Sequence, residues 1–221
     1  MPAFPLRSET DALDWRVQMP SRLRQLPTIY RLKLWLREIE PPIWRRLEVP
    51  ADITLPRLHR VIQIAIGWED YHLHLFEIGR HRYEVPDPED LYKSKSIDER
   101  RVRLDRVVEQ VGTEWSYLYD FGDGWGHGLL LEAIVLPEPG VHYPRCTAGA
   151  LSGPPEDTGG PYSYKEYLEA LADPRHERHE ELLAWRGPFD PERFNLKAIN
   201  RELAATFRRP TKPSDLTKSQ D

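Results

Sequence analysis

The sequence predicts an α+β fold, a single domain with an antiparallel or mixed sheet and helices packed mainly on one face. Apolar and polar residues alternate through 30–36, with the period of a half-buried strand. Most strand-like segments precede residue 137, and most helix-like segments follow residue 164. One helical pattern, at 54–67, separates the early strands, so the regular strand–helix alternation of a parallel α/β sheet is missing.

The first predicted elements are a hairpin and a helix. Residues 30–36 and 44–49 are predicted to form two strands joined by a proline-containing loop. Thr54 and Pro56 then favour a helix start, because a hydroxyl suits the N-cap and proline suits the first turn. Apolar residues at i, i+3, i+4 and i+7 give this helix one buried face, and Gly67 is expected to end it as a left-handed C-cap.

The remaining elements are predicted from shorter patterns. Strands are expected at 72–78, 82–85, 114–119 and 128–136, and helices at 164–171, 177–185 and 191–205. Residues 86–100 and 137–163 are rich in polar residues, proline and glycine, which indicates long loops. Residues 102–108 fit either a strand or a helix.

Three parts of the chain are expected to differ in order. Residues 1–27 are proline-rich and aperiodic, which predicts a flexible N-terminal arm. Residues 28–206 carry the periodic patterns and form the α+β domain. Residues 207–221 are polar and are expected to be a disordered C-terminal tail.

Composition favours a cytoplasmic protein without a membrane partner. The formal net charge is −5, so the bulk attraction that draws basic proteins to nucleic acid is missing, and nucleic acid stays open as a partner only through a local basic face. The single cysteine, Cys146, allows no intramolecular disulfide and suits a reducing compartment. We find neither a signal-peptide pattern nor an apolar stretch of membrane-spanning length.

The most distinctive segment of the chain is Tyr119-Asp120-Phe121-Gly122-Asp123-Gly124-Trp125-Gly126-His127. Gly122, Asp123 and Gly124 tolerate positive φ, so a turn between two strands is expected here. The Asp-Phe-Gly triplet has the letters of the magnesium-binding triplet of protein kinases. The glycine-rich loop, strand lysine and catalytic-loop residues of a kinase do not accompany it in order, so we interpret it as a hairpin.

Histidines and carboxylates near this hairpin form the leading candidate site, whose members are Asp120, Asp123, Trp125, His127, His72 and His74. His72 and His74 are two apart on a predicted strand and therefore share one face. If that face meets His127, imidazoles and carboxylates together suit zinc, manganese or iron, or a general acid–base pair. The alternative is structural, with the histidines satisfying local hydrogen bonds or standing in solvent.

A second group concerns the long loop. Arg45 is expected to pair with Glu156 or Asp157 and to pin the loop to the sheet. Alternatively, Arg45 and Arg46 bind a phosphate or carboxylate ligand.

Three remaining residues are interpreted without a chemical role. His176 and His179 lie at i, i+3 among glutamates, which favours a solvated charged face over a metal site. Cys146 has no evident activating partner in the sequence, which disfavours nucleophilic catalysis.

Five motifs, taken in order, resemble the plasmid pRiA4b ORF-3-like family, whose members are sometimes described as TnpR-like passenger proteins of insertion elements. They are Pro41-Pro42-Ile43-Trp44-Arg45; Gly67-Trp68 before His72-Leu73-His74; Tyr119-Asp120-Phe121-Gly122-Asp123 with Trp125 and His127; Pro154-Pro155-Glu156-Asp157 before Gly159-Gly160; and Asp173-Pro174 with His176 and His179 before Phe189-Asp190-Pro191.

The resemblance covers roughly residues 28 to 204. It implies an α+β fold and a bacterial plasmid or mobile-element context. It implies little about activity, because the TnpR-like label rests on gene context. Family members often carry further cysteines near the Pro-Pro-Glu-Asp segment, where Gly153 and Thr158 stand here, so a cysteine-based metal or redox site is not expected.

Three functions remain open from the sequence. We favour a non-catalytic binding or adaptor module with a protein partner, because no complete catalytic set is present. Such a module predicts an exposed apolar patch around Trp68, Trp115 or Trp125.

The two alternatives make different predictions. A metal-assisted hydrolase with a divalent ion requires His72, Asp123 and His127 to converge. A DNA-associated accessory protein of a recombinase requires a contiguous Arg/Lys face, and the acidic net charge disfavours it.

Overall fold

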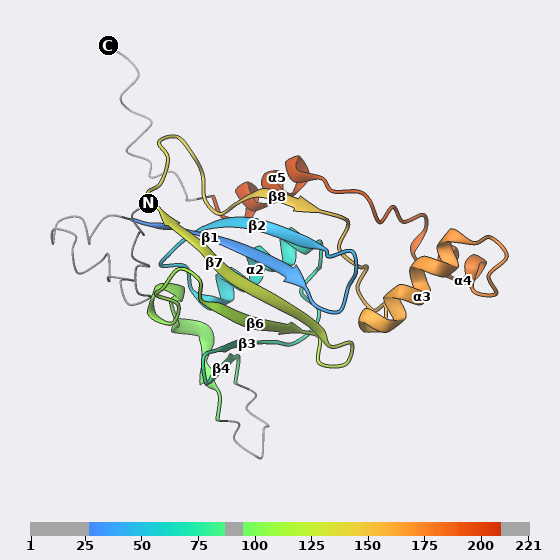
Figure 1. Cartoon of the computed structure of the whole chain (residues 1–221), viewed down its shortest axis with the longest axis horizontal. Helices are drawn as coiled ribbons and strands as arrows, with labels where there is room; N and C mark the ends of the chain where they lie inside the picture. Colours follow the sequence, from blue (N-terminus) through green and yellow to red (C-terminus); the bar gives the residue numbers. More distant parts are fainter. Residues whose placement is uncertain (1–26, 87–94, 209–221) are drawn as a thin grey trace, which may run out of the picture.

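The computed structural model describes residues 27–86 and 95–208, which are organised around one mixed sheet (Figure 1). Its strands lie in the order β5-β4-β3-β6-β7-β1-β2-β8, and every neighbouring pair is antiparallel except β4 and β5. The strands are β1 (Ile29–Leu36), β2 (Trp44–Pro50), β3 (His74–Ile78), β4 (His81–Glu84), β5 (Ile97–Asp98), β6 (Glu114–Tyr119), β7 (Trp125–Val135) and β8 (Arg145–Ala150).

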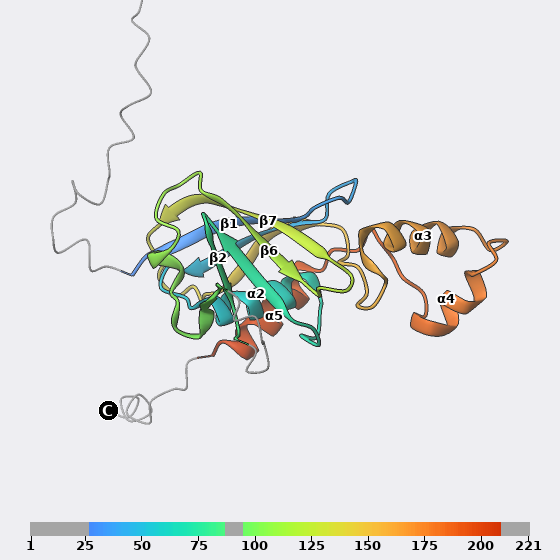
Figure 2. The same cartoon turned by 90° about the horizontal axis from the view of Figure 1, so that it is seen from below.

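The helices cover one face of the sheet and one end of it. They are α2 (Leu55–Ile66), α3 (Gly160–Ala172), α4 (His179–Arg186) and α5 (Leu196–Thr206), with short 3-10 turns η2 (Glu99–Arg101) and η3 (Leu104–Arg106). Figure 2 shows α2 and α5 on the same side of the sheet, whereas α3 and α4 project beyond one end of it. No helix in the described ranges covers the opposite face of β1, β2 and β7.

The core lies between the sheet and α2. In β1 the alternate residues Leu32, Leu34 and Leu36 are buried, as the period of two predicts. The apolar face of α2 is also buried, and the helix ends at Gly67 with φ 104° as expected. Its start differs, because Thr54 occupies the N-cap position without a side-chain cap bond and the Leu55 amide donates to the Val102 carbonyl instead.

The α+β prediction is confirmed, with helices and strands largely segregated along the chain. The predicted loop 137–163 was wrong in part, since it contains β8, which pairs with β2 at the sheet edge. The loop 86–100 likewise contains β5, and β7 begins at Trp125 instead of residue 128. Residues 102–108 form η3 and extended chain, neither a strand nor a regular helix.

The C-terminal helices exist with shifted boundaries. α3 begins at Gly160, earlier than predicted, because Gly159 and Gly160 adopt positive φ and Pro161 suits the first turn. α4 begins at His179 and α5 at Leu196, both later than predicted.

The predicted arm (1–27) and tail (207–221) fall almost wholly outside the described residues, as do residues 87–94 of the predicted loop. Of the helices that are described, none has both the length and the apolar composition for a membrane span.

Candidate functional site

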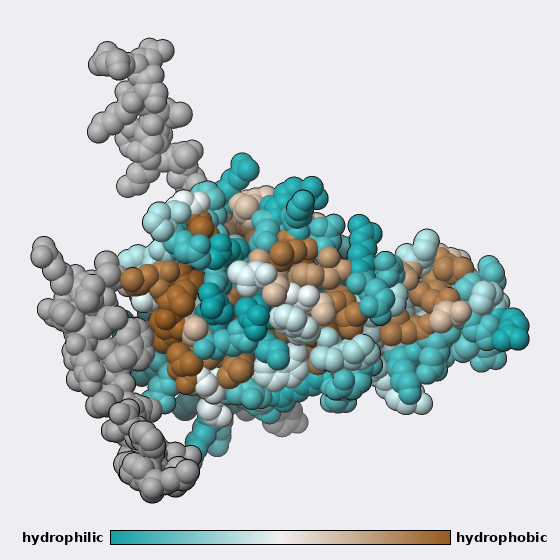
Figure 3. Space-filling view, turned by 45° about the horizontal axis from the view of Figure 1, so that its top comes forward, coloured by the Kyte–Doolittle hydropathy of each residue, from teal (hydrophilic) through white to brown (hydrophobic). Residues whose placement is uncertain are grey.

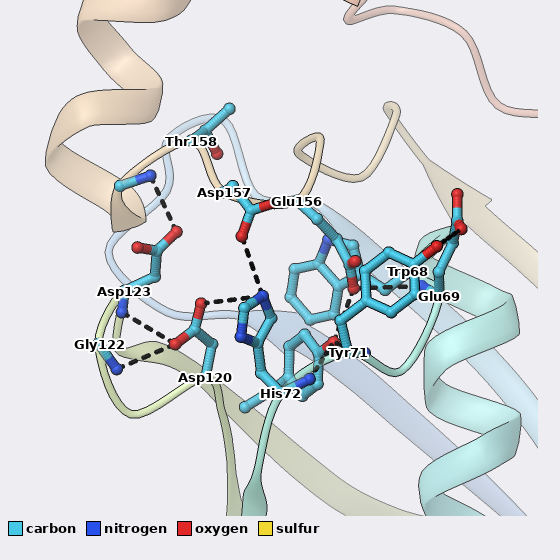
Figure 4. A network of polar contacts seen from close by, with 12 residues as sticks. Trp68, Glu69, Tyr71, His72, Asp120, Gly122, Asp123, Glu156, Asp157 and Thr158 are labelled. Carbon is cyan, nitrogen blue, oxygen red and sulfur yellow. Dashed lines mark hydrogen bonds and ion pairs between the residues drawn. The ribbon is translucent and has the colours of Figure 1, made fainter.

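Three segments far apart in the sequence meet at the end of the sheet where α3 begins (Figure 4). His72 lies between α2 and β3, Asp120 follows β6, and Asp157 lies in the loop before α3. One ligand atom from each side chain lies within 4.8 Å of the others. Among the described residues, this is the one group of three or more histidine, cysteine or acidic side chains that offers such a spacing.

Asp120 is held by the turn that follows it. Its backbone adopts φ 56°, which aspartate tolerates better than most residues, and its amide donates to the Leu73 carbonyl. Its Oδ1 accepts hydrogen bonds from the amides of Gly122 (2.9 Å) and Asp123 (3.3 Å). The second oxygen, Oδ2, faces His72 Nε2 at 3.6 Å. The turn therefore fixes one carboxylate oxygen and directs the other toward the imidazole.

The predicted turn chemistry needs one correction. Of the three residues expected to tolerate positive φ, only Gly124 uses it, at 73°. Asp120 itself takes the left-handed conformation in their place, because its own carboxylate closes the turn.

Asp157 completes the group from the long loop. Its Oδ1 lies 2.9 Å from His72 Nε2, and its Oδ2 lies 3.7 Å from the Arg186 guanidinium. The Asp157 side chain is 54% exposed and that of His72 31% exposed, whereas that of Asp120 is only 12% exposed. The site is thus open to solvent on the Asp157 side and enclosed on the Asp120 side.

A set of hydrogen bonds fastens the long loop to the sheet beside these residues. Glu156 Oε1 accepts from the Tyr119 hydroxyl (2.6 Å) and from the Glu69 amide (3.1 Å). The indole of Trp68 donates to the Pro154 carbonyl at 2.8 Å. On the other side, the Gly159 amide donates to Asp123 Oδ2 at 2.8 Å. These contacts position Asp157 from both ends of its segment.

The predicted members of the site fall into three places. His72 and Asp120 come together, and Asp123 lies beside them with one oxygen committed to the Gly159 amide. Trp125 and His127 point into the core, where His127 packs edge-on against Trp68. The convergence of His72 with His127 that a metal-assisted hydrolase requires is therefore not observed, because strand alternation places His127 on the buried face of β7.

His74 belongs to a separate, buried cluster. Its ring stacks on that of His59 from α2, with centroids 3.6 Å apart and planes 4° apart. His59 contacts the Tyr117 hydroxyl (2.7 Å) and Asp70 (2.6 Å), and His74 contacts Glu99 at 3.1 Å. The expectation that His72 and His74 share one pocket was wrong, because β3 begins only at His74.

Arg45 pins the long loop through backbone carbonyls and not through carboxylates. Its guanidinium donates to the carbonyls of Ala65 (2.7 Å), Trp44 (2.8 Å), Ala150 (2.7 Å) and Leu151 (2.9 Å). The predicted pairing with Glu156 or Asp157 was wrong, since Arg45 is buried under the sheet on the side of α2. Burial lowers the pKa of Arg45 to about 10, so the side chain still carries its charge at neutral pH. Arg46 pairs with Glu132 on the opposite face.

Cys146, His176 and His179, for which the sequence indicates no chemical role, have structural partners. Burial raises the pKa of the Cys146 thiol to about 11, which keeps it protonated at neutral pH. His179 is buried and bonds the Ala170 carbonyl through Nδ1, while His176 Nδ1 accepts from the Arg178 amide. His179 is thus a buried anchor between α3 and α4, and the expectation that it stands on a solvated face was wrong.

The expected apolar patch around the tryptophans is not present. Trp68, Trp115 and Trp125 are all buried. On the face seen in Figure 3, hydrophobic residues form separate patches among hydrophilic ones. A binding function must therefore use other residues than these tryptophans.

The group His72, Asp120 and Asp157 suits a divalent cation. Ligand atoms that share one ion at about 2.1 Å lie roughly 3.0 to 3.4 Å apart in octahedral or tetrahedral geometry. The distances from His72 Nε2 to the two carboxylate oxygens, 2.9 and 3.6 Å, bracket that spacing. Two carboxylates also balance the charge of a dication, and three protein ligands leave positions for solvent or a second molecule.

The comparisons with known proteins agree with the motifs. The sequence model of the plasmid pRiA4b ORF-3-like protein family matches residues 28–198. The uncharacterized protein y4hQ of Sinorhizobium fredii is 42% identical over 188 residues, which cover 82% of this chain and 95% of that protein. The crystal structure of a protein of unknown function, MM3350, from Methanosarcina mazei Go1 superimposes with a TM-score of 0.72 at 38% identity, covering 78% of this chain and 98% of the other.

Proposed function

Because the chain belongs to the plasmid pRiA4b ORF-3-like family and three motifs of that resemblance meet at one point, we propose that the protein is a binding module built around a divalent-cation site. The ligands in this proposal are His72, Asp120 and Asp157. The observation that carries it is the convergence of one imidazole nitrogen and two carboxylate oxygens, each from a different loop, within 4.8 Å.

The surroundings of the site favour binding over a purely structural contact. An ion pair that served only to hold the loop would add little, because the loop is already fastened by Glu156, Trp68 and the Gly159 amide. Exposed ion pairs contribute about 0 to 1 kcal/mol. The partly exposed imidazole of His72 and the Asp120 carboxylate, which is fixed by its turn, instead resemble ligands that are held in place and reached from the Asp157 side.

The ligand types favour a borderline metal. Imidazole suits Zn²⁺ and Fe²⁺, carboxylates also suit Mn²⁺, and Mg²⁺ and Ca²⁺ prefer oxygen ligands alone. When bound, the ion would join the β6–β7 turn, the segment before β3 and the loop before α3. Binding would therefore link the three segments through the ion and create one surface for a partner molecule.

Calorimetric titration of the full chain with Zn²⁺ and, separately, Mn²⁺ tests this proposal. We expect one ion per chain for the wild type and at least a tenfold weaker affinity for His72→Ala, which removes one ligand, and for Asp120→Asn, which removes the negative charge of another. The matched controls are His81→Ala and Asp52→Asn, which change exposed residues elsewhere on the surface and should leave the affinity unchanged. Equal affinity in His72→Ala and the wild type, or no uptake of either ion, contradicts the site.

The wider context is also part of the proposal. The family name supports a plasmid or mobile-element setting, and the free, buried thiol of Cys146 supports a cytoplasmic location. Labelling of the native and the unfolded protein with a thiol reagent checks that the thiol is free and buried, on which the second point rests. The thiol should react only after unfolding.

A further inference from the structure

A pair of tryptophans lies side by side on the sheet face that no described helix covers. Trp35 of β1 and Trp44 of β2 are direct cross-strand partners, and both are half-buried. Their neighbours Leu34 and Arg45 are buried on the opposite face, so alternation places the two indoles on the open side. Gly128 of β7 continues the same row on the other side of Trp35.

The glycine explains how the Trp35 ring is seated. A Cβ built on Gly128 would lie only 2.2 Å from the six-membered ring of Trp35. The indole therefore lies across the backbone of β7, in space that any other residue would fill. One face of the ring rests on the backbone of β7, and the Trp35 side chain is only partly buried.

Cations surround this aromatic row. The Lys33 ammonium lies 5.9 Å from the ring centre of Trp35 and 6.0 Å from that of Trp44. The Arg46 guanidinium lies 5.6 Å from the Trp44 ring centre. Arg37 lies on the other side of the row, next to Gly126.

The face keeps positive charge although the chain is acidic overall. Arg31 and Arg145 share the buried carboxylate of Glu48, Arg145 also pairs with Glu138, and Glu132 balances Arg46. Arg37 has only a distant partner, Glu114 at 4.0 Å, with both side chains exposed. Among the described residues Lys33 has no carboxylate within 4.0 Å. The face thus has more cations than anions, in a chain whose net charge is −5.

We propose that this face binds single-stranded nucleic acid, with bases stacked on Trp35 and Trp44 and phosphates beside Lys33 and Arg37. Aromatic rings on an open sheet, bordered by cations, provide the stacking and the charge that unpaired strands need. A duplex keeps its bases stacked internally and cannot use the rings. An acidic peptide matches the charge but gains nothing from a flat aromatic row. Stacking and phosphate contacts are common to DNA and RNA, so we expect single strands of both kinds to bind.

Fluorescence anisotropy with labelled twelve-nucleotide strands of dT and of U, on the full chain, tests the proposal. We expect the affinity to fall as the salt concentration rises from about 50 to about 200 mM, because phosphate contacts release counterions on binding. Trp35→Ala and Trp44→Ala should each weaken binding at least fivefold, since each removes a ring on which one base stacks. Trp35→Phe and Trp44→Phe should retain most of the affinity, and circular dichroism checks that each variant is folded.

Charge and aromatic controls complete the design. Lys33→Glu should weaken binding and make it less sensitive to salt. Trp185→Ala on α4 and Lys165→Glu on α3 remove an exposed tryptophan and an exposed lysine elsewhere, and should bind like the wild type. Undetectable binding, an equal loss in Trp185→Ala, or equal affinity for a duplex or for polyglutamate overturns the proposal.

Discussion

Two clusters of histidine and carboxylate in the described part of the chain differ in how their ring nitrogens are used. In the open cluster, His72 presents Nε2 to two carboxylates, and one of these is largely exposed. In the buried cluster, both nitrogens of His59 are occupied, by Tyr117 and by Asp70, and the ring is stacked on His74. The same residue types therefore form a ligand group at the surface and a packed polar layer in the core.

Burial and hydrogen-bond saturation decide which role a histidine takes. The buried layer has no room for an ion between its rings, because the ring centres are 3.6 Å apart. Gln63 reinforces it by donating to the Tyr117 hydroxyl and accepting from the Asp70 amide. In the open cluster only three ligand atoms converge, and solvent has access from one side. Residue type alone does not identify a metal site.

The largest expected effect concerns the buried histidines and pH. Burial lowers the pKa of His127 to about 4, and burial together with His74 lowers the pKa of His59 to about 4. In the unfolded chain both protonate near the ordinary value of about 6.5, so between these values the unfolded state binds more protons. The free energy of unfolding should therefore fall as pH drops below 6.5, by on the order of 2 kcal/mol per pH unit.

Urea unfolding followed by circular dichroism at several pH values between 7.5 and 5 measures this slope. His127→Phe removes one of the two titrating groups and should roughly halve the slope. An unfolding free energy that stays constant across this range contradicts the neutral, buried state of these rings.

The next effect separates the two clusters by substitution. His59→Ala removes a stacked, hydrogen-bonded ring from the core and should lower the free energy of unfolding by about 3 kcal/mol, because it leaves a cavity and unpaired polar groups. His72→Ala should cost less than about 1 kcal/mol, as expected for a half-exposed ion pair. Urea midpoints at pH 7.5 without added metal give both values.

A matched surface control gives the baseline for this comparison. His81→Ala changes an exposed histidine, so the change in the free energy of unfolding should be near zero. If His72→Ala destabilises the protein as much as His59→Ala, the open cluster is a structural pin like the buried one, and the distinction between the clusters fails.

Local patterns predicted those parts of the fold whose burial repeats along the sequence. The alternation in β1 and the apolar face of α2 are examples, because each element meets the core along one regular face. β8 has no such pattern. Its residues after Arg145 are small, and its strand character comes from pairing with β2 and from contacts with α5, where Asn200 bonds the Cys146 backbone. A Cβ on Gly149 would lie 2.7 Å from the ring of Phe194, a contact between segments that the sequence does not reveal.

The candidate site was predictable in part for the same reason. His72 and Asp120 were expected because they lie in distinctive motifs, whereas Asp157 was assigned to loop pinning. Its meeting with His72 depends on where a loop 85 residues further along the chain docks. The buried cluster was missed, although His59 and Gln63 carried a signal. They lie four residues apart on the buried face of α2, where two polar side chains require partners.

The smallest expected effect concerns the hydrogen bond from Tyr119 to Glu156, which fastens the long loop to the sheet. The test is whether this bond also positions the metal ligand Asp157. Burial and the neighbouring Glu156 raise the pKa of Tyr119, so its hydroxyl stays protonated and donates to Glu156. Tyr119→Phe removes that donor and the acceptor of the Tyr71 amide, which should lower the free energy of unfolding by about 1 to 2 kcal/mol. Zn²⁺ affinity should fall several-fold, because Asp157 directly follows Glu156. Tyr162→Phe, at an 86% exposed tyrosine of α3, should change neither quantity. If Tyr119→Phe loses stability but keeps its Zn²⁺ affinity, the hydrogen bond from Tyr119 to Glu156 stabilises the fold without positioning Asp157. The open cluster is then held by the turn after Asp120 and by the Gly159 amide alone.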